Sequence, residues 1–187
     1  SLLSPPLLNS VNDGKNDVTG SITRPADKVP ARPPAPPPQL VTATDQLPIA
    51  IGGPRLRNAA MAGDGAAAYE VAVRCAEGRG VPVNLEEAAR WYERAAGKGL
   101  APAQFRYASL LEKGQGVKKD LGGARRLYLA AAAKGNAKAM HNLAVLYAEG
   151  IDGKPEYGAS AQWFGKAAQR GIADSQYNLG VLYARGL

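Results

Sequence analysis

The stretch ARWYERAAGKG at residues 89–99 recurs in the chain as RRLYLAAAAKG at residues 125–135 and as AQWFGKAAQRG at residues 161–171. The three copies lie 36 residues apart, and each keeps an aromatic ring at its fourth position and a glycine at its end. Because several independent positions share one period, we conclude that the chain contains an internal repeat, and periods of about 20–50 residues are typical of repeat arrays. Two series of glycines keep the same spacing: Gly63, Gly99, Gly135 and Gly171, and Gly78, Gly114, Gly150 and Gly186.

Each repeat unit is predicted to contain two helices. The first is clearest at residues 137–148, where Ala139, Leu143 and Tyr147 recur at i, i+4 and i+8 and share one helical face. Gly150 is expected to end this helix, because glycine readily adopts the left-handed conformation that is common at helix C-termini.

The second helix follows a short loop, which is clearest as GQGVKKD at residues 114–120. Asp120, and Asn84 in the preceding copy, are expected to cap the helix that follows by accepting a backbone hydrogen bond. The second helix is predicted at residues 85–96, packed on its partner through one face. The residues predicted on that face are Ala88, Ala89, Trp91, Tyr92, Ala95 and Ala96.

The repeat also sets the expected domain organisation. The array is predicted to cover residues 53–187, beginning at Pro54 with the second helix of an incomplete copy. Because solenoids need a polar terminal cap, we expect that the natural protein continues past Leu187 or that this edge meets another chain. The expected units are a half repeat at 53–63, repeats at 64–99, 100–135 and 136–171, and an incomplete repeat at 172–187.

Residues 1–52 differ in composition from the array. Eleven of the 14 prolines lie in the first 60 residues, whereas all the aromatic residues come later. A segment without large side chains cannot offset the entropy that is lost when its backbone is ordered. Residues 1–52 are therefore predicted to be a disordered, Pro-rich linker, and the run PARPPAPPP at residues 30–38 favours extended polyproline II.

Charge and cysteine content exclude several classes of protein. The net charge of +7 is spread along the chain without a stripe of Lys and Arg, so nucleic-acid binding is not expected. The apolar stretches fall short of the roughly 18 residues of a membrane-spanning helix, so no span is predicted within this chain. Cys75 is the only cysteine, which excludes an intramolecular disulfide, and its repeat position predicts a small buried hydrophobic residue.

Sequence signatures of an enzyme are absent, and we predict that the chain is not one. The GRG run at residues 78–80 and the GQG run at residues 114–116 have no strand before them and no Gly-Lys-Ser or Gly-Lys-Thr after them. They are predicted to be interhelical turns rather than phosphate-binding loops. His141 is the sole histidine, so a histidine-based metal cluster is excluded and a packing or surface role is expected. No catalytic residue, metal or cofactor is assigned.

The pattern of the copies resembles that of Sel1-like repeats. The first helix carries Ala-x-x-x-Leu-Gly-x-x-Tyr, the loop Gly-x-Gly-Val, and the second helix Ala-x-x-Trp-Tyr-x-x-Ala-Ala-x-x-Gly. The resemblance implies an all-α fold, a right-handed α-α superhelix that is TPR-like, that is, similar to tetratricopeptide arrays. Two departures leave the repeat length unchanged: Cys75 replaces the first-helix aromatic residue, and IDGKP at residues 151–155 replaces one Gly-Val loop.

Longer runs resemble the PodJ family of alphaproteobacterial polar localisation factors. They are KGNAKAMHNLAVLYAEG at residues 134–150, DGKP at residues 152–155 and ADSQYNLG at residues 173–180. This resemblance implies a periplasmic repeat domain of an inner-membrane protein, with a membrane span upstream and often a peptidoglycan-binding module downstream.

The two resemblances together predict a non-catalytic scaffold that positions protein partners at the cell pole. The sensor domain of a polar histidine kinase is the candidate partner. Three alternatives stay open: a cell-wall module that binds peptidoglycan or regulates a wall enzyme, a chaperone adaptor, and a hydrolase.

Candidate partner-binding residues follow from similarity to tetratricopeptide arrays, in which the first helices line the concave wall. In competition with this interpretation, an aromatic stripe at helical spacing can instead be core, and Asn142 and Asn178 can tie adjacent helices together. Lys138 is a further candidate. The two predicted ladders are Tyr69, Phe105, His141 and Tyr177, and Val73, Ser109, Val145 and Val181.

Overall fold

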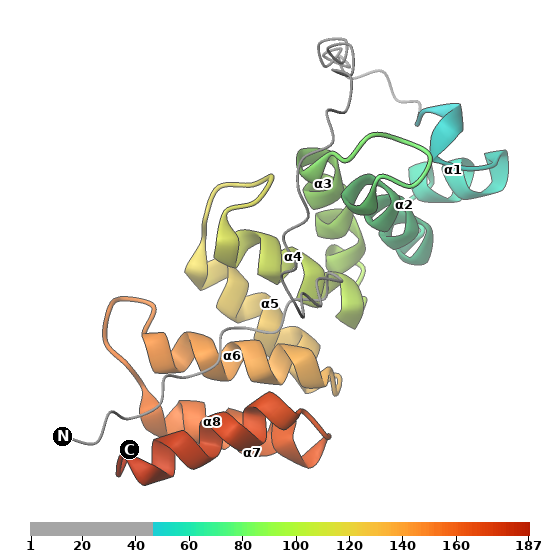
Figure 1. The fold of residues 1–187 in the computed structure, drawn as a ribbon. Helices are drawn as coiled ribbons and strands as arrows, with labels where there is room; N and C mark the ends of the chain where they lie inside the picture. The colour runs from blue at the N-terminus through green and yellow to red at the C-terminus, as the bar shows by residue number, and fades with distance from the viewer. Residues whose placement is uncertain (1–46) are drawn as a thin grey trace, which may run out of the picture. The chain divides into compact units, whose positions relative to one another are not determined.

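The computed structural model describes residues 47–187, which form eight α-helices and one short 3₁₀ helix and contain no β-strand (Figure 1). This confirms the predicted all-α repeat solenoid. Residues 1–46, the greater part of the predicted linker, lie outside the described residues. In chain order the elements are η1 (Ile49–Ile51), α1 (Pro54–Met61), α2 (Gly65–Glu77), α3 (Leu85–Gly97), α4 (Ala101–Lys113), α5 (Leu121–Ala133), α6 (Ala137–Glu149), α7 (Tyr157–Gln169) and α8 (Ala173–Ala184).

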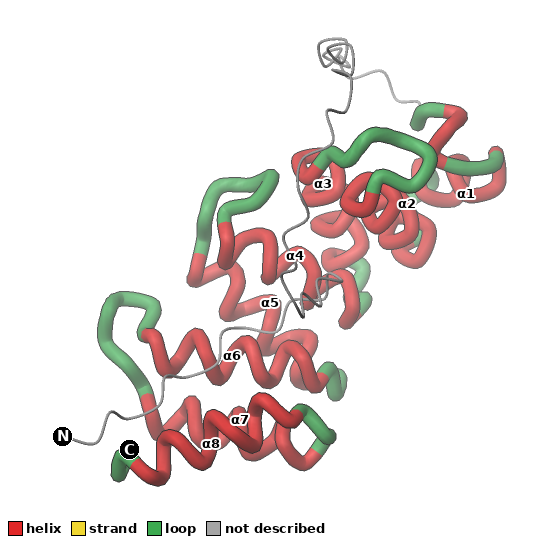
Figure 2. The backbone as a smooth tube through the Cα atoms, viewed as in Figure 1, coloured by secondary structure: helices red, strands yellow, loops and turns green. Residues whose placement is uncertain are grey.

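Each helix packs mainly on the helices next to it in the chain (Figure 2). The most extensive contacts join α2 to α3, α4 to α5 and α6 to α7, which are the two helices of one repeat unit. Less extensive contacts connect one unit to the next, between α3 and α4, between α5 and α6, and between α7 and α8. Within residues 47–187, no helix combines the length and the apolar character that crossing a membrane requires.

The helix ends follow the local chemistry expected from the sequence. Asn84 Oδ1 accepts a hydrogen bond from the Glu87 backbone N–H at 3.0 Å, and Asp120 Oδ1 accepts one from Gly123 at 2.8 Å. Both predicted caps are thus confirmed, and such a cap stabilises a helix by about 0.5–2 kcal/mol. Gly114 ends α4 in the left-handed conformation, with φ of 65°.

The second glycine of the Gly-x-Gly loops permits close approach between neighbouring units. A Cβ atom at Gly116 would overlap the backbone of Leu85 and Glu86, at the start of α3. A Cβ atom at Gly80 would overlap the carbonyl oxygen of Ala50 in the same way. The loops are therefore interhelical turns, as predicted, and they pack closely against the chain that precedes them. Their second glycine allows this close approach because it has no side chain.

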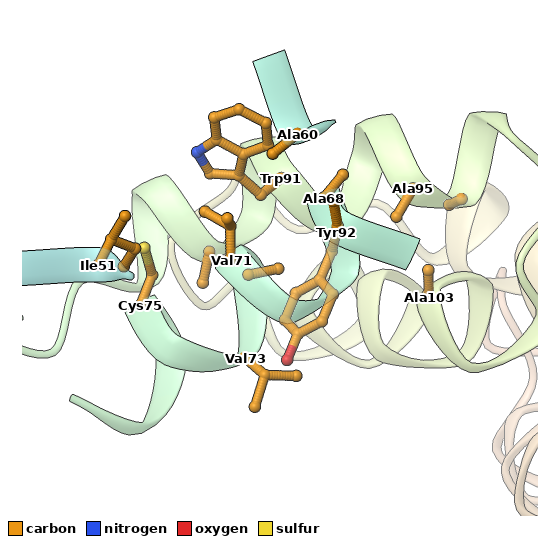
Figure 3. Close-up of a cluster of buried hydrophobic side chains, with 14 residues drawn as sticks. Ile51, Ala60, Ala68, Val71, Val73, Cys75, Trp91, Tyr92, Ala95 and Ala103 are labelled. Atoms are coloured by element: carbon orange, nitrogen blue, oxygen red, sulfur yellow. The ribbon is translucent and has the colours of Figure 1, made fainter. Parts of the chain in front are cut away.

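The hydrophobic core begins with a cluster around α2 and α3, which we call the first core cluster (Figure 3). All six residues predicted on the buried face of the second helix are buried. Cys75 is also buried, as predicted, and desolvation, with a smaller contribution from Glu87, raises the pKa of its thiol to about 11. The cluster comprises Ile51, Ala60, Ala67, Ala68, Val71, Ala72, Val73, Cys75, Ala88, Trp91, Tyr92, Ala95, Ala96 and Ala103.

Packing onto the array starts before the predicted boundary between residues 52 and 53. Ile51 is buried in the first core cluster, and Leu47 packs against it. Arg74 Nη1 on α2 donates a hydrogen bond to the Ile51 carbonyl oxygen at 2.9 Å. Composition alone placed Leu47 and Ile51 in the linker, because two isolated aliphatic residues give no periodic signal. Their burial extends the packed part of the chain to residue 47.

Candidate protein-binding surface

The predicted aromatic ladder lies mostly inside the hairpins. In three units, the ring on the first helix faces the ring on the second helix of the same unit. Tyr177, the fourth member, is 45% exposed. The three ring pairs are Tyr69 with Tyr92, Phe105 with Tyr128 and His141 with Phe164, with centroids 5.7, 6.0 and 5.4 Å apart.

The polar members of the candidate set also turn inward. His141 is fully buried, and its Nδ1 lies 2.7 Å from the Ser175 hydroxyl oxygen on α8. Asn142 is fully buried as well, and its side-chain amide donates a hydrogen bond to the Tyr128 hydroxyl oxygen at 3.0 Å. Each contact joins neighbouring helices from different units. His141 has the packing role that was expected, and Asn142 ties α6 to α5.

Tyr128 is the centre of a buried polar cluster between α4, α5 and α6. Its hydroxyl donates to Glu112 Oε2 at 2.5 Å and accepts from Asn142. Burial, followed by the nearby Glu112 carboxylate, raises the pKa of Tyr128 above its usual range. The phenol therefore stays neutral and acts as a link between the two units that meet here.

Five of the predicted partner-binding residues lie in the interior. A side chain with almost no exposed surface cannot contact a partner, so these positions hold the array together instead. The periodicity was correct, but it could not distinguish the face between helices from the face toward a partner. Tyr69 and Lys138 are half-buried, and Val73 and Val181 of the second ladder are buried. The five interior residues are Phe105 (3% exposed), His141 (0%), Asn142 (0%), Val145 (2%) and Asn178 (0%).

A shallow groove of about 280 Å³ lies between α3, α4 and the loop that follows α4, and we call it the α3–α4 groove. Cavities that hold drug-sized molecules are commonly about 300–1,000 Å³. This groove is therefore suited to one or two side chains of a larger partner. Its lining residues are Glu86, Ala89, Arg90, Glu93, Tyr107, Gly116 and Val117.

The groove is lined on the α3 side by two glutamates and an arginine. Glu86 and Glu93 lie seven residues apart on α3, so they share a helical face, and both are exposed. Arg90 between them is paired with Glu87, with Nη1 and Oε1 2.7 Å apart. Burial, and then the Glu93 carboxylate to which the Tyr107 hydroxyl is hydrogen-bonded, raise the pKa of Tyr107. The phenol is thus held neutral against α3.

The repeat itself does not require these groove residues. One copy later, the positions of Glu86, Glu93 and Tyr107 are occupied by Gly122, Leu129 and Leu143. The array therefore folds without carboxylates and a phenol at these places. The groove was not predicted from the sequence, and the signal that could have indicated it is this departure from the repeat at three positions.

The chemistry of the groove is non-covalent. Two carboxylates accept hydrogen bonds or pair with cations, Arg90 beside them is already paired with Glu87, and Val117 offers a small apolar contact. Among the described residues, no three His, Cys, Asp or Glu side chains are grouped as a metal site would need.

Most of the chain matches the model of one repeat family. The family model described as Sel1 repeat matches four consecutive segments, at residues 65–100, 101–136, 137–172 and 173–187. No curated protein matches the chain.

Solved structures similar to this chain have the same repeat fold. One is a protective antigen present in uropathogenic Escherichia coli strains, which displays an SLR fold; it is 34% identical with a TM-score of 0.67. The match covers 71% of this chain but only 28% of the antigen. Another is a Sel1 repeat protein from Oxalobacter formigenes, which is 32% identical with a TM-score of 0.60. That match covers 67% of this chain and 95% of the other.

Proposed function

This chain belongs to the Sel1 repeat family, whose members generally act as protein–protein interaction scaffolds, and we propose that it binds a protein partner through the α3–α4 groove. Sel1 repeat proteins are typically non-catalytic interaction modules, and the proposal involves no chemical turnover. The observation that supports the groove is its polar lining, which the repeat does not require, because Gly122, Leu129 and Leu143 take the equivalent places.

The lining also specifies the kind of contact. A Lys or Arg side chain of the partner would pair with Glu86 or Glu93, beside Arg90, whose charge is already paired with Glu87, and would place its aliphatic stem over Val117. Charged groups at the rim of an interface mainly affect the association rate and its salt dependence. Partner binding through the groove should therefore weaken as the salt concentration rises.

Site-specific photo-crosslinking in cells tests the groove. A photo-reactive amino acid replaces Arg90 in the groove, and in a control chain it replaces Arg126, which holds the same position one copy later and is also exposed. The expected result is a discrete crosslinked protein with the substitution at Arg90 and none with the substitution at Arg126. Equal products from both positions, or none from either, would refute the groove.

We propose that, in the cell, this chain is the periplasmic part of a membrane-anchored polar localisation factor. The support is the resemblance of residues 134–150 and 173–180 to the PodJ family. A polar sensor histidine kinase is the proposed partner. The test is complementation of a cell that lacks the corresponding factor, with and without residues 53–187. If polar recruitment of the kinase is the same in both cases, this setting is wrong.

Peptidoglycan is the alternative ligand in the same compartment. Co-sedimentation of the purified chain with isolated peptidoglycan distinguishes it from a protein partner. Binding that survives substitution of both Glu86 and Glu93 by Gln, in the absence of any other protein, would favour the cell-wall alternative.

A further inference from the structure

The loop between α6 and α7 departs from the Gly-Val pattern of the two earlier loops (Figure 2). At the places of Gly116 and Val117 it carries Asp152 and Gly153. Gly116 allows close approach to the start of α3, and Val117 packs against a cluster of buried hydrophobic residues. Asp152 and Gly153, in contrast, are both exposed, and a Cβ atom at Gly153 would meet no atom within 4 Å. The tip of this loop therefore lacks the two contacts that hold the earlier loop against the array.

An aspartate that precedes a glycine reacts with its own backbone when both groups are free to meet. The glycine amide nitrogen attacks the side-chain carboxyl carbon, a C–N bond forms, and the OH of the protonated carboxyl leaves with the amide proton as water. Water then opens the five-membered succinimide at either carbonyl. Opening at the main-chain carbonyl leaves isoaspartate, whose backbone runs through Cβ. The step is effectively unimolecular, and glycine has no side chain to shield the nitrogen.

The two reacting groups in the α6–α7 loop are weakly held. Within the described residues, the Asp152 carboxylate takes part in no hydrogen bond or ion pair. The Gly153 N–H donates one long hydrogen bond, of 3.3 Å, to the Gly150 carbonyl oxygen. Both residues are exposed, so water reaches the ring that forms. Little in the fold therefore opposes ring closure at this pair.

Another Asp-Gly pair, Asp64–Gly65, is held in place by the fold. Asp64 Oδ1 caps α2 by accepting a hydrogen bond from the Ala67 backbone N–H at 2.7 Å. Gly65 is buried in the first turn of α2, where a Cβ atom would lie 2.9 Å from the Cβ of Lys98. Ring closure there would break the cap and unwind the start of the helix. The chain thus contains the same dipeptide as a matched control.

We propose that Asp152 is a site of spontaneous isomerisation to isoaspartate in the folded chain, whereas the fold protects Asp64. The modification adds one main-chain atom between residues 152 and 153 and leaves the free carboxylate on the α-carbon. Because the reaction needs no enzyme, isoaspartate accumulates with the age of the molecule. The inference is independent of partner binding through the α3–α4 groove.

The effect of the modification stays within the loop. The Glu156 backbone N–H donates a hydrogen bond to the Tyr147 carbonyl oxygen at 2.8 Å and so closes the base of the loop. Asp152 lies at the tip, beyond this bond. The packing of α6 on α7 should therefore be retained, and the circular dichroism of the chain should not change as isoaspartate accumulates.

Peptide mapping of the aged chain tests the site. The purified chain is kept at neutral pH and body temperature for several weeks and is then digested with trypsin, which does not cleave between Lys154 and Pro155. Asp152 is the sole aspartate in the peptide of residues 139–166, as Asp64 is in the peptide of residues 58–74. Isoaspartate is detected by an isoaspartyl methyltransferase, which transfers a methyl group from S-adenosylmethionine to the isoaspartyl carboxylate. The Asp152 peptide should contain about tenfold more isoaspartate or above, because closure at Asp64 must first break a helix cap.

Two controls separate the chemistry from the fold. Asp152→Glu would need a six-membered ring for closure and should abolish the signal in its peptide. The change is at an exposed position, so this variant is expected to fold, and circular dichroism checks this. In guanidinium chloride the protection of Asp64 is lost, and the two peptides should form isoaspartate at similar rates.

Three outcomes would overturn the inference. The first is an Asp152 peptide without isoaspartate in the folded chain, and the second is an equal amount in both peptides of the folded chain. The third is an Asp64 peptide that stays unmodified in guanidinium chloride while Asp152 reacts, since the fold would then not be the cause of the difference. None of these outcomes bears on photo-crosslinking from Arg90.

Discussion

The hairpin of α2 and α3 and the region from α6 to α8 are built from the same repeat, but their interiors differ. None of the polar or charged side chains on α2 and α3 is buried, so the interior of this hairpin is built from hydrophobic residue types. The region from α6 to α8 buries five polar side chains, each 0% exposed: His141, Asn142, Ser160, Ser175 and Asn178. One backbone design therefore supports two kinds of interior.

The difference shows how polarity enters a repeat core. Phe105 on α4 and Ala139 on α6 belong to one cluster of buried hydrophobic residues. One copy later they are replaced by His141 and Ser175, which are 2.7 Å apart. Both members of the pair change together, so neither polar group is left without a partner. An unsatisfied buried polar group costs about 1–3 kcal/mol, whereas a matched exchange can be nearly neutral.

The largest expected effect is at Tyr128, which lies at the boundary between the two interiors. Tyr128→Ala removes a fully buried ring and the hydrogen bonds to Glu112 and Asn142. The free energy of unfolding should fall by about 3–5 kcal/mol, as measured by urea denaturation. Arg126→Ala, at an exposed position on the same helix, should change it by less than about 0.5 kcal/mol. A loss at Tyr128 no larger than that at Arg126 would contradict the assigned role.

The next effect concerns the matched pair. His141→Phe recreates the ring of Phe105 but leaves the Ser175 hydroxyl without its histidine partner, so it should cost about 1–3 kcal/mol. Adding Ser175→Ala restores the apolar pairing and should recover about 1 kcal/mol or more of that loss. Urea denaturation of the two single variants and the double variant gives the coupling. If the changes in the free energy of unfolding of the two single variants simply add up in the double variant, His141 and Ser175 are not coupled.

Particular residues show which parts of this organisation the sequence predicts and which it does not. The period of 36 residues placed the helices, the caps at Asn84 and Asp120, and the buried face of α3. It could not show that His141 would meet Ser175, because that contact joins helices from different units, 34 residues apart. The groove was missed for a related reason: Glu93 and Tyr107 come from different units, and only their stacking creates a surface.

Measuring stability at alkaline pH tests the role of Tyr128. The folded-state pKa of Tyr128 is raised, so its contribution to stability is complete below the unfolded value of about 10 and is lost as pH rises above it. The raised pKa values of Cys75 and Tyr107 add to this loss, so the urea midpoint of the chain should fall as pH rises above about 9. The urea midpoint of the Tyr128→Phe variant should fall less steeply over the same pH range, although this variant is less stable than the unmodified chain at neutral pH. Parallel curves would rule out Tyr128 as the group responsible.

The smallest effect is expected in the apolar interior, at Cys75. Its burial and its pKa of about 11 should make the thiol unreactive toward a disulfide reagent in the folded chain and reactive in urea. Cys75→Ala should lower the free energy of unfolding by about 1 kcal/mol. Rapid modification under native conditions would mean that this core opens more readily than its packing indicates.

In the function proposed above, partner contact comes from the α3–α4 groove, whereas the buried polar residues hold the array together. Isothermal titration calorimetry with the partner captured from Arg90 tests it most directly. The variant with Glu86→Gln and Glu93→Gln should bind about three- to tenfold more weakly with unchanged stability, and the variant with His141→Phe and Ser175→Ala should bind as the unmodified chain does. Full affinity in the groove variant, together with lost affinity in the interior variant, would contradict the claim.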